Sequence, residues 1–179
     1  MDEFRQVVLF IAMSLDGYIA DSNGGVEWLN GQEDGGEHVD TYAEFVKGID
    51  TVLMGWNTYH QIVTELSPTE WVYSDFTTYV FTHHKGRPAE NIRFTEESPA
   101  KLIRQLKACG GKDIWVCGGA NLVSQLRHSD LIDQYIVSII PTLLGKGIRL
   151  FGEMEKEQLL FLTKIQDDHG IVELTYRRR

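Results

Sequence analysis

The order of apolar and polar positions along the chain predicts strands that alternate with helices, followed by strands alone. The predicted strands are the apolar or β-branched runs at residues 6–13, 51–55, 77–82, 91–94, 113–117, 133–141, 159–166 and 171–177. Helical spacing of apolar residues begins near residues 41, 56, 98 and 119. This alternation predicts an α/β fold with a mainly parallel sheet and helices on both faces, and the last two runs predict a terminal antiparallel hairpin.

Two segments near the N-terminus lack this periodicity. Residues 14–25 are rich in turn formers but carry three apolar side chains, which fits an ordered loop and equally a surface loop with a few anchors. Residues 30–38 are too polar and glycine-rich to pack, and a mobile lid is one interpretation. A helix is expected from Thr41, with Thr41 and Glu44 as a capping box and an apolar face that extends to Ile49.

Two predicted strands end at glycine and lead directly into a helix start. Gly118 and Gly119 end one strand, and Gly55 ends another, where Asn57 or Thr58 is able to cap the helix. Glycine lets a ligand approach the first free N–H groups of a helix, which favour an anion such as a dinucleotide pyrophosphate. A glycine pair is also an ordinary tight connection, so the functional interpretation requires both turns to face one crevice beyond the carboxyl ends of the strands.

Other phosphate and metal signals are weak. Neither glycine turn has the third glycine of the usual dinucleotide fingerprint, and the sequence contains no phosphate-binding loop with Lys and Ser or Thr. His83 and His84 are expected to point in opposite directions from a strand, so no metal site is predicted. With Lys85 they form a cationic strand end suited to a phosphate.

Composition narrows the class of protein. A chain of 179 residues with 42% hydrophobic content is long enough for a substantial core, and we expect one domain over residues 1–179. A net charge of −9 argues against nucleic-acid and membrane binding, which need clustered cations. Cys109 and Cys117 match no metal-ligand spacing and are expected to be thiols. No targeting leader or membrane-length apolar run is found, so a cytoplasmic protein is expected.

Four short blocks, taken together, resemble the dihydrofolate-reductase-like superfamily. They are MSLDGYIA at 13–20, VLMGWNTY at 52–59, VCGGANL at 116–122, and the segment from LID at 131–133 to PTLLGKGIRLF at 141–151. They are most similar to the branch that contains the reductase domain of riboflavin biosynthesis. The resemblance implies a three-layer α/β/α fold with a mixed sheet of eight or nine strands, NADPH as hydride donor, and a homodimer.

The resemblance also implies which residues hold the cofactor. They are Ala12, Ile19, Gly24, Gly55, Trp56, Asn57, Thr58, Thr82, His83, Cys117, Gly118, Gly119, Ala120, Asn121 and Leu122. The first three match positions that border the nicotinamide, the two helix starts match phosphate-binding positions, and Thr82 and His83 match the adenosine and its 2′-phosphate.

Trp56 departs from the family pattern. The family commonly carries arginine after Met-Gly, a residue suited to gripping the 2′-phosphate. NADH is therefore an alternative to NADPH, unless a nearby cation replaces that charge or Trp56 stacks on the adenine. The candidate cations are His83, His84, Lys85 and Arg87.

The substrate side departs further. True folate reductases have a carboxylate four residues before a phenylalanine, where it hydrogen-bonds the pterin. Here Thr41 stands before Phe45, and Asp40 is one residue away on a helix that turns about 100° per residue, so dihydrofolate is not the expected substrate.

The expected activity is an NAD(P)H-dependent reduction of a small C=N or C=O substrate, pterin-like or ribosylaminopyrimidine-like. The proton is expected to come from water or from a carboxylate such as Asp40 or Asp16, although Asp16 also fits a turn-forming role. The alternative is a non-catalytic homodimer that binds a nucleotide or flavin on the same fold.

Overall fold

The computed structural model describes residues 4–32, 40–86, 89–154 and 156–179. In order across the main sheet, the strands are β5 (Ile92–Thr95), β4 (Thr77–Phe81), β3 (Ile49–Gly55), β6 (Asp113–Gly118), β1 (Val7–Ser14), β7 (Gln134–Ile140), β10 (Ile171–Arg178) and β9 (Leu160–Asp168). Two short strands, β2 (Tyr18–Ala20) and β8 (Ile148–Arg149), pair separately. The helices are α1 (Thr41–Val46), α2 (Trp56–Gln61), its π-helical continuation η1 (Ile62–Leu66), α3 (Pro99–Ala108) and α4 (Ala120–His128).

The six strands from β5 to β7 run parallel, whereas β10 is antiparallel to both of its neighbours. β9 and β10 are joined by His169 and Gly170, which both have positive φ, as a two-residue hairpin turn requires. The prediction of a mixed, mainly parallel sheet with a C-terminal antiparallel hairpin is therefore confirmed.

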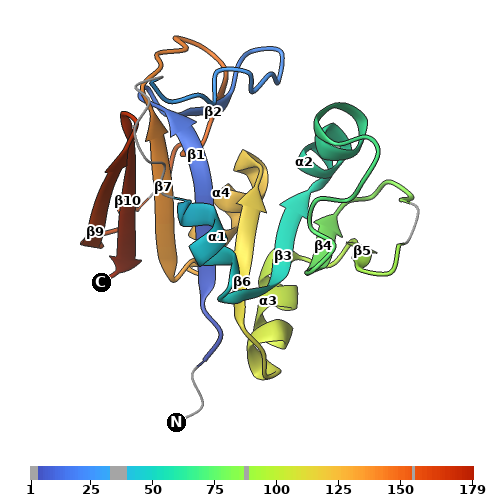
Figure 1. The fold of residues 1–179 in the computed structure, drawn as a ribbon. Coiled ribbons are helices and arrows are strands. Elements are labelled where there is room, and N and C mark those ends of the chain that lie inside the picture. The colour runs from blue at the N-terminus through green and yellow to red at the C-terminus, as the bar shows by residue number, and fades with distance from the viewer. Residues whose placement is uncertain (1–3, 33–39, 87–88, 155) are drawn as a thin grey trace.

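Helices cover both faces of the sheet (Figure 1). α3 and α4 pack on one face through an aliphatic core that includes Leu9, Ile103 and Leu126. α1 lies on the opposite face, where the core is largely aromatic. Side chains alternate between the faces along each strand, so β1 contributes Leu9 to the first core and Phe10 to the second.

Arg5 joins several segments at the amino ends of the parallel strands. Its guanidinium group donates hydrogen bonds to the carbonyl oxygens of Leu106 and Lys112 and to the hydroxyl of Thr51, and it pairs with Asp50. Arg5 is 6% exposed, so its charge is buried, and each guanidinium nitrogen has a hydrogen-bond partner. The end of α3 and the starts of β3 and β6 are thereby held to the entry of β1.

The start of α1 differs from the prediction. Asp40 is the N-cap, because its carboxylate accepts a hydrogen bond from the Ala43 amide at 2.8 Å. The predicted capping box of Thr41 and Glu44 is therefore wrong. The predicted lid at residues 30–38 falls mainly outside the described residues.

The end of α1 also differs from the prediction. The helix stops at Val46, and the Gly48 amide donates to the Phe45 carbonyl in a closing turn. Ile49 begins β3 and belongs to the aromatic core, so its apparent helical spacing was misleading. None of the described helices has the length and apolar character needed to cross a membrane.

Candidate functional site

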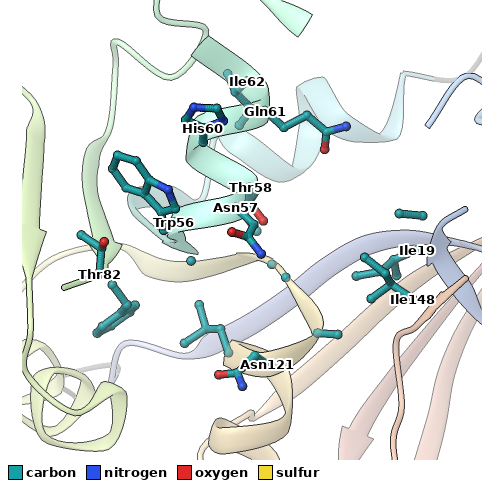
Figure 2. Close-up of a pocket in the computed structure, with 18 of the residues that line it drawn as sticks. Ile19, Trp56, Asn57, Thr58, His60, Gln61, Ile62, Thr82, Asn121 and Ile148 are labelled. Atoms are coloured by element: carbon teal, nitrogen blue, oxygen red, sulfur yellow. The ribbon is translucent and has the colours of Figure 1, made fainter. Parts of the chain in front are cut away.

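A pocket of about 980 Å³ lies at the carboxyl ends of β1, β3 and β6. Figure 2 shows the start of α2, with Trp56 and Asn57, facing Asn121 of α4 across this space. Ile19 and Ile148 line one end of the pocket together. Both glycine turns therefore open into a single pocket, as the sequence predicted.

All of the cofactor-binding residues predicted from the sequence line this pocket. They come from β1, β2 and the loop after it, the β3–α2 turn, the end of β4, and the β6–α4 turn. Because the chain is folded so that these distant segments meet, one extended ligand is able to contact all of them. Their individual roles stay predictions.

The two helix starts at the pocket have no side-chain cap. Gly55 is the N-cap of α2 and Gly119 is the N-cap of α4, so the prediction that Asn57 or Thr58 caps α2 is wrong. A Cβ atom built on Gly55 would lie 3.9 Å from the Gly119 nitrogen, and one built on Gly119 would lie 3.4 Å from Thr58 Oγ1. The two turns thus lie against each other, and their first amide groups are not capped by side chains.

Trp56 lies in an aromatic cluster at the α2 side of the pocket. Its ring is 4.8 Å from that of His84 and 5.6 Å from that of Tyr59. β4 ends at Phe81, so the histidines that follow it do not alternate along a strand as predicted. The His84 imidazole instead packs on the Trp56 indole.

The end of the pocket beyond β4 contains both acidic and basic groups. His83 Nδ1 lies 3.6 Å from a carboxylate oxygen of Glu96, and Glu97 pairs with Lys101 at 2.7 Å. His83, Glu96 and Glu97 all line the pocket. The described residues here do not form an isolated basic cluster, and Arg87 lies outside them.

The two candidate proton donors are engaged elsewhere in the fold. The Asp16 carboxylate accepts hydrogen bonds from the Ser14 hydroxyl and from the amides of Leu144 and Gly145. These bonds, the Ser14 bond foremost, lower the pKa of Asp16 to about 2, so it is ionised at neutral pH. Asp40 caps α1, and neither carboxylate lines the pocket. The structure therefore gives no support to either residue as the proton donor.

The inner wall of the pocket carries two neutral polar groups, of which the sequence analysis singled out Cys117 but not Tyr73. Tyr73 and Cys117 both line the pocket, with the phenol oxygen 3.8 Å from Sγ. Burial raises the pKa of Tyr73 far above its usual range and that of the Cys117 thiol to about 11. Both groups are therefore protonated at neutral pH.

Other contacts missed by the sequence analysis join distant segments. Gln61 of α2 donates a hydrogen bond to the Gly24 carbonyl at 2.8 Å, which ties the loop after β2 to the pocket wall. Glu173 of β10 is buried and accepts from the hydroxyls of Thr41 at 3.0 Å and Ser138 at 3.3 Å. Strand alternation was the available signal for Glu173, since it falls on the same face as Thr175.

The described part of the chain contains no group of side chains suited to bind a metal ion. No three His, Cys, Asp or Glu side chains there are grouped to hold an ion. The polar groups of the pocket are backbone amides, hydroxyls, amide side chains and a thiol, together with the imidazole and carboxylate groups at the end beyond β4. Such groups suit an organic ligand with phosphate groups.

Sequence comparison relates the chain to proteins of riboflavin biosynthesis and to an uncharacterized protein. The sequence pattern of the RibD C-terminal domain matches residues 5–172. The uncharacterized protein YwjB of Bacillus subtilis (strain 168) is 39% identical over 178 residues, which cover 97% of this chain and 98% of YwjB. The riboflavin biosynthesis protein RibD of Haemophilus influenzae is 23% identical, and the match covers 90% of this chain and 52% of that protein.

Solved structures give the same result. A Shewanella sp. PV-4 protein named for riboflavin biosynthesis superposes with a TM-score of 0.84 at 27% identity, covering 97% of this chain and 99% of that one. A second structure, from Thermotoga maritima, superposes with a TM-score of 0.70 at 15% identity. It is named a diaminohydroxyphosphoribosylaminopyrimidine deaminase/5-amino-6-(5-phosphoribosylamino)uracil reductase. That match covers 98% of this chain and 57% of the other. The fold is dihydrofolate-reductase-like, and the chain belongs to the family of RibD C-terminal domains.

Proposed function

We propose that the protein is an NAD(P)H-dependent reductase that transfers hydride to a small C=N or C=O substrate. The observation that carries the proposal is the contact between two glycine-started helices whose uncapped ends open into one pocket. Two sets of free amides suit the two phosphates of a dinucleotide. Membership of the RibD C-terminal family supports the same chemistry.

The pocket residues fit this cofactor class. The turns at Gly55 and Gly119 would hold the diphosphate, while Ala12 and Ile19 offer an apolar border for the nicotinamide. Thr82 and His83 would contact the adenosine end. When bound, the reduced nicotinamide supplies a hydride, and the protein supplies binding and orientation.

Calorimetric titration with NADPH and with NADH tests the proposal. We expect a 1:1 isotherm with at least one of them, and NADPH is the first choice from the family. Oxidation of the bound cofactor is then followed by absorbance with a panel of pterins, ribosylaminopyrimidines and aldehydes. No heat with either dinucleotide at millimolar concentration would remove the proposal, whereas binding without oxidation by any of these substrates would favour a nucleotide-binding protein without reductase activity.

We also propose that the chain forms a homodimer through the β9 edge of the sheet. Phe161 and Ile165 on this outer strand are 50% and 62% exposed, and Leu159 just before it is 55% exposed. Exposed apolar edge strands invite pairing with another chain. Light scattering after size exclusion is expected to give twice the chain mass, and Ile165→Lys is expected to shift the species toward monomer.

A further inference from the structure

Tyr73 lies on the inner wall of the pocket, beside the strand end that leads into the second glycine turn. Its phenol oxygen is 3.8 Å from Sγ of Cys117, the residue that immediately precedes Gly118. Ala12, Cys117 and Tyr73 all line the pocket. β1 and β6 are parallel neighbours with Leu9 opposite Val116, so Ala12 and Cys117 lie near the same ends of adjacent strands. Because Ala12 is expected to border the nicotinamide, a substrate placed to accept the nicotinamide's hydride would lie near this wall.

The Tyr73 ring is held in place by two indoles. It packs edge-on to Trp71 at 5.4 Å and to Trp115 at 5.1 Å between ring centroids. Trp115 is fixed in turn, because its indole N–H donates to the Phe10 carbonyl at 2.9 Å. The direction of the Tyr73 hydroxyl is therefore set before any ligand binds.

The Tyr73 hydroxyl has a weak hydrogen-bond partner within the protein. Among the described residues, its hydrogen-bond partner is the Cys117 thiol, and sulfur is a weak acceptor. The raised pKa values of both groups keep them neutral, so the phenol retains its proton at neutral pH. A fixed, neutral O–H donor thus faces a weak acceptor at the wall of a ligand pocket.

We propose that the Tyr73 hydroxyl donates a hydrogen bond to the oxygen or nitrogen of the substrate's reducible C=O or C=N bond. This inference rests on the proposed function. During reduction the substrate carbon gains a hydride from the reduced nicotinamide, which is the two-electron donor. The electron pair of the π bond moves to the heteroatom, and a proton from water completes the new O–H or N–H bond. Tyr73 keeps its proton and stabilises the negative charge that develops on the heteroatom.

Tyr73→Phe tests the proposal, with Tyr59→Phe as the matched control. Tyr59 packs against Trp71 in the same aromatic cluster at 5.7 Å but does not line the pocket. We expect Tyr73→Phe to lower kcat about ten- to hundredfold with the best substrate of the panel. Binding of pterin in the presence of NADP⁺, followed by pterin fluorescence, is expected to weaken about fivefold, the loss of one neutral hydrogen bond.

Cofactor binding separates this inference from the proposed function. Tyr73→Phe and Tyr59→Phe are both expected to retain the dinucleotide affinity and the melting temperature of the wild type. Equal kcat and pterin affinity in wild type and Tyr73→Phe would overturn the role of Tyr73 while the reductase assignment stands. Equal losses in both variants, or a loss of dinucleotide affinity in Tyr73→Phe, would also overturn it, because either result indicates a structural effect. A wild-type protein that binds no dinucleotide would overturn the proposed function itself.

Discussion

The α-helices of the described residues begin in two different ways. Asp40 caps α1, and the Ser98 hydroxyl caps α3 by accepting from the Lys101 amide at 3.3 Å. α2 and α4 begin at Gly55 and Gly119 and have no side-chain cap. The two uncapped starts are the ones that lie against each other in the pocket.

Backbone geometry does not explain the glycines at the uncapped starts. Gly55 has φ −82° and ψ 166°, and Gly119 has φ −88° and ψ −163°. These extended conformations are the ones that serine and aspartate adopt at an N-cap, where they contribute about 1 kcal/mol more than alanine. Glycine is only a few tenths of a kcal/mol less stabilising than these residues at an N-cap, and it leaves the first amides without a side-chain acceptor and open to a ligand.

The largest expected effect comes from adding a cap to α4. Gly119→Asp is expected to weaken NADPH binding about 100-fold, because the carboxylate occupies the amides and repels a diphosphate. The free energy of unfolding, measured in urea, is expected to stay level or rise by a few tenths of a kcal/mol. Gly119→Ala is the control, since it adds a Cβ atom without an acceptor or a charge. An unchanged NADPH affinity in Gly119→Asp would show that the α4 amides do not hold the cofactor.

Trp56→Arg tests whether the start of α2 lies near the 2′-phosphate of NADPH. A guanidinium at the first residue of this helix is expected to raise the ratio of NADPH to NADH affinity about tenfold, through charge-assisted hydrogen bonds to the 2′-phosphate. Calorimetry with both dinucleotides measures the ratio. Trp56→Gln removes the indole without adding charge, so an equal change in that variant would assign the effect to the lost indole.

Asp40→Ala removes a cap from a helix outside the pocket. The expected result is a loss of about 1 kcal/mol in the free energy of unfolding, because the Ala43 amide loses its acceptor. Dinucleotide affinity and kcat are expected to be unchanged. Asp40→Asn retains a capping oxygen and is expected to recover most of the stability, whereas a lost kcat in both variants would restore Asp40 as a catalytic candidate.

Asp16→Asn has the smallest expected effect and a defined pH dependence. The pKa of Asp16 is lowered from 3.8 to about 2 in the folded chain, so its ionised form stabilises the fold above about pH 4. This contribution is lost as the pH falls toward 2. The difference in melting temperature between wild type and Asp16→Asn is therefore expected to shrink between pH 4 and pH 2, and a constant difference would contradict this account.

The sheet and the pocket were predictable from the sequence because both depend on local signals. The apolar runs predict the strands, and glycine at the ends of β3 and β6 marks the two turns. Beyond this, the resemblance supplied positions such as Ile19 and Thr82, which no local pattern would connect to Gly118. All of them line the pocket.

The remaining features depend on contacts between distant segments. The sequence analysis assigned no role to Tyr73, and only the fold brings it to Cys117, 44 residues away along the chain. Asp40 and Thr41 are both good capping residues, and the capping-box spacing to Glu44 wrongly favoured Thr41. In the structure Thr41 donates instead to Glu173, a partner 132 residues away, which leaves the cap to Asp40.

Arg5 and Gln61 join distant segments at opposite ends of the parallel strands. The Arg5 guanidinium joins the end of α3 to the starts of β3 and β6 at the amino ends of the strands, whereas the pocket lies at their carboxyl ends. At the pocket, Gln61 of α2 donates a hydrogen bond to the Gly24 carbonyl in the loop after β2. A displacement of the loop after β2 would break this contact at the pocket and leave the Arg5 contacts at the opposite ends of the strands in place.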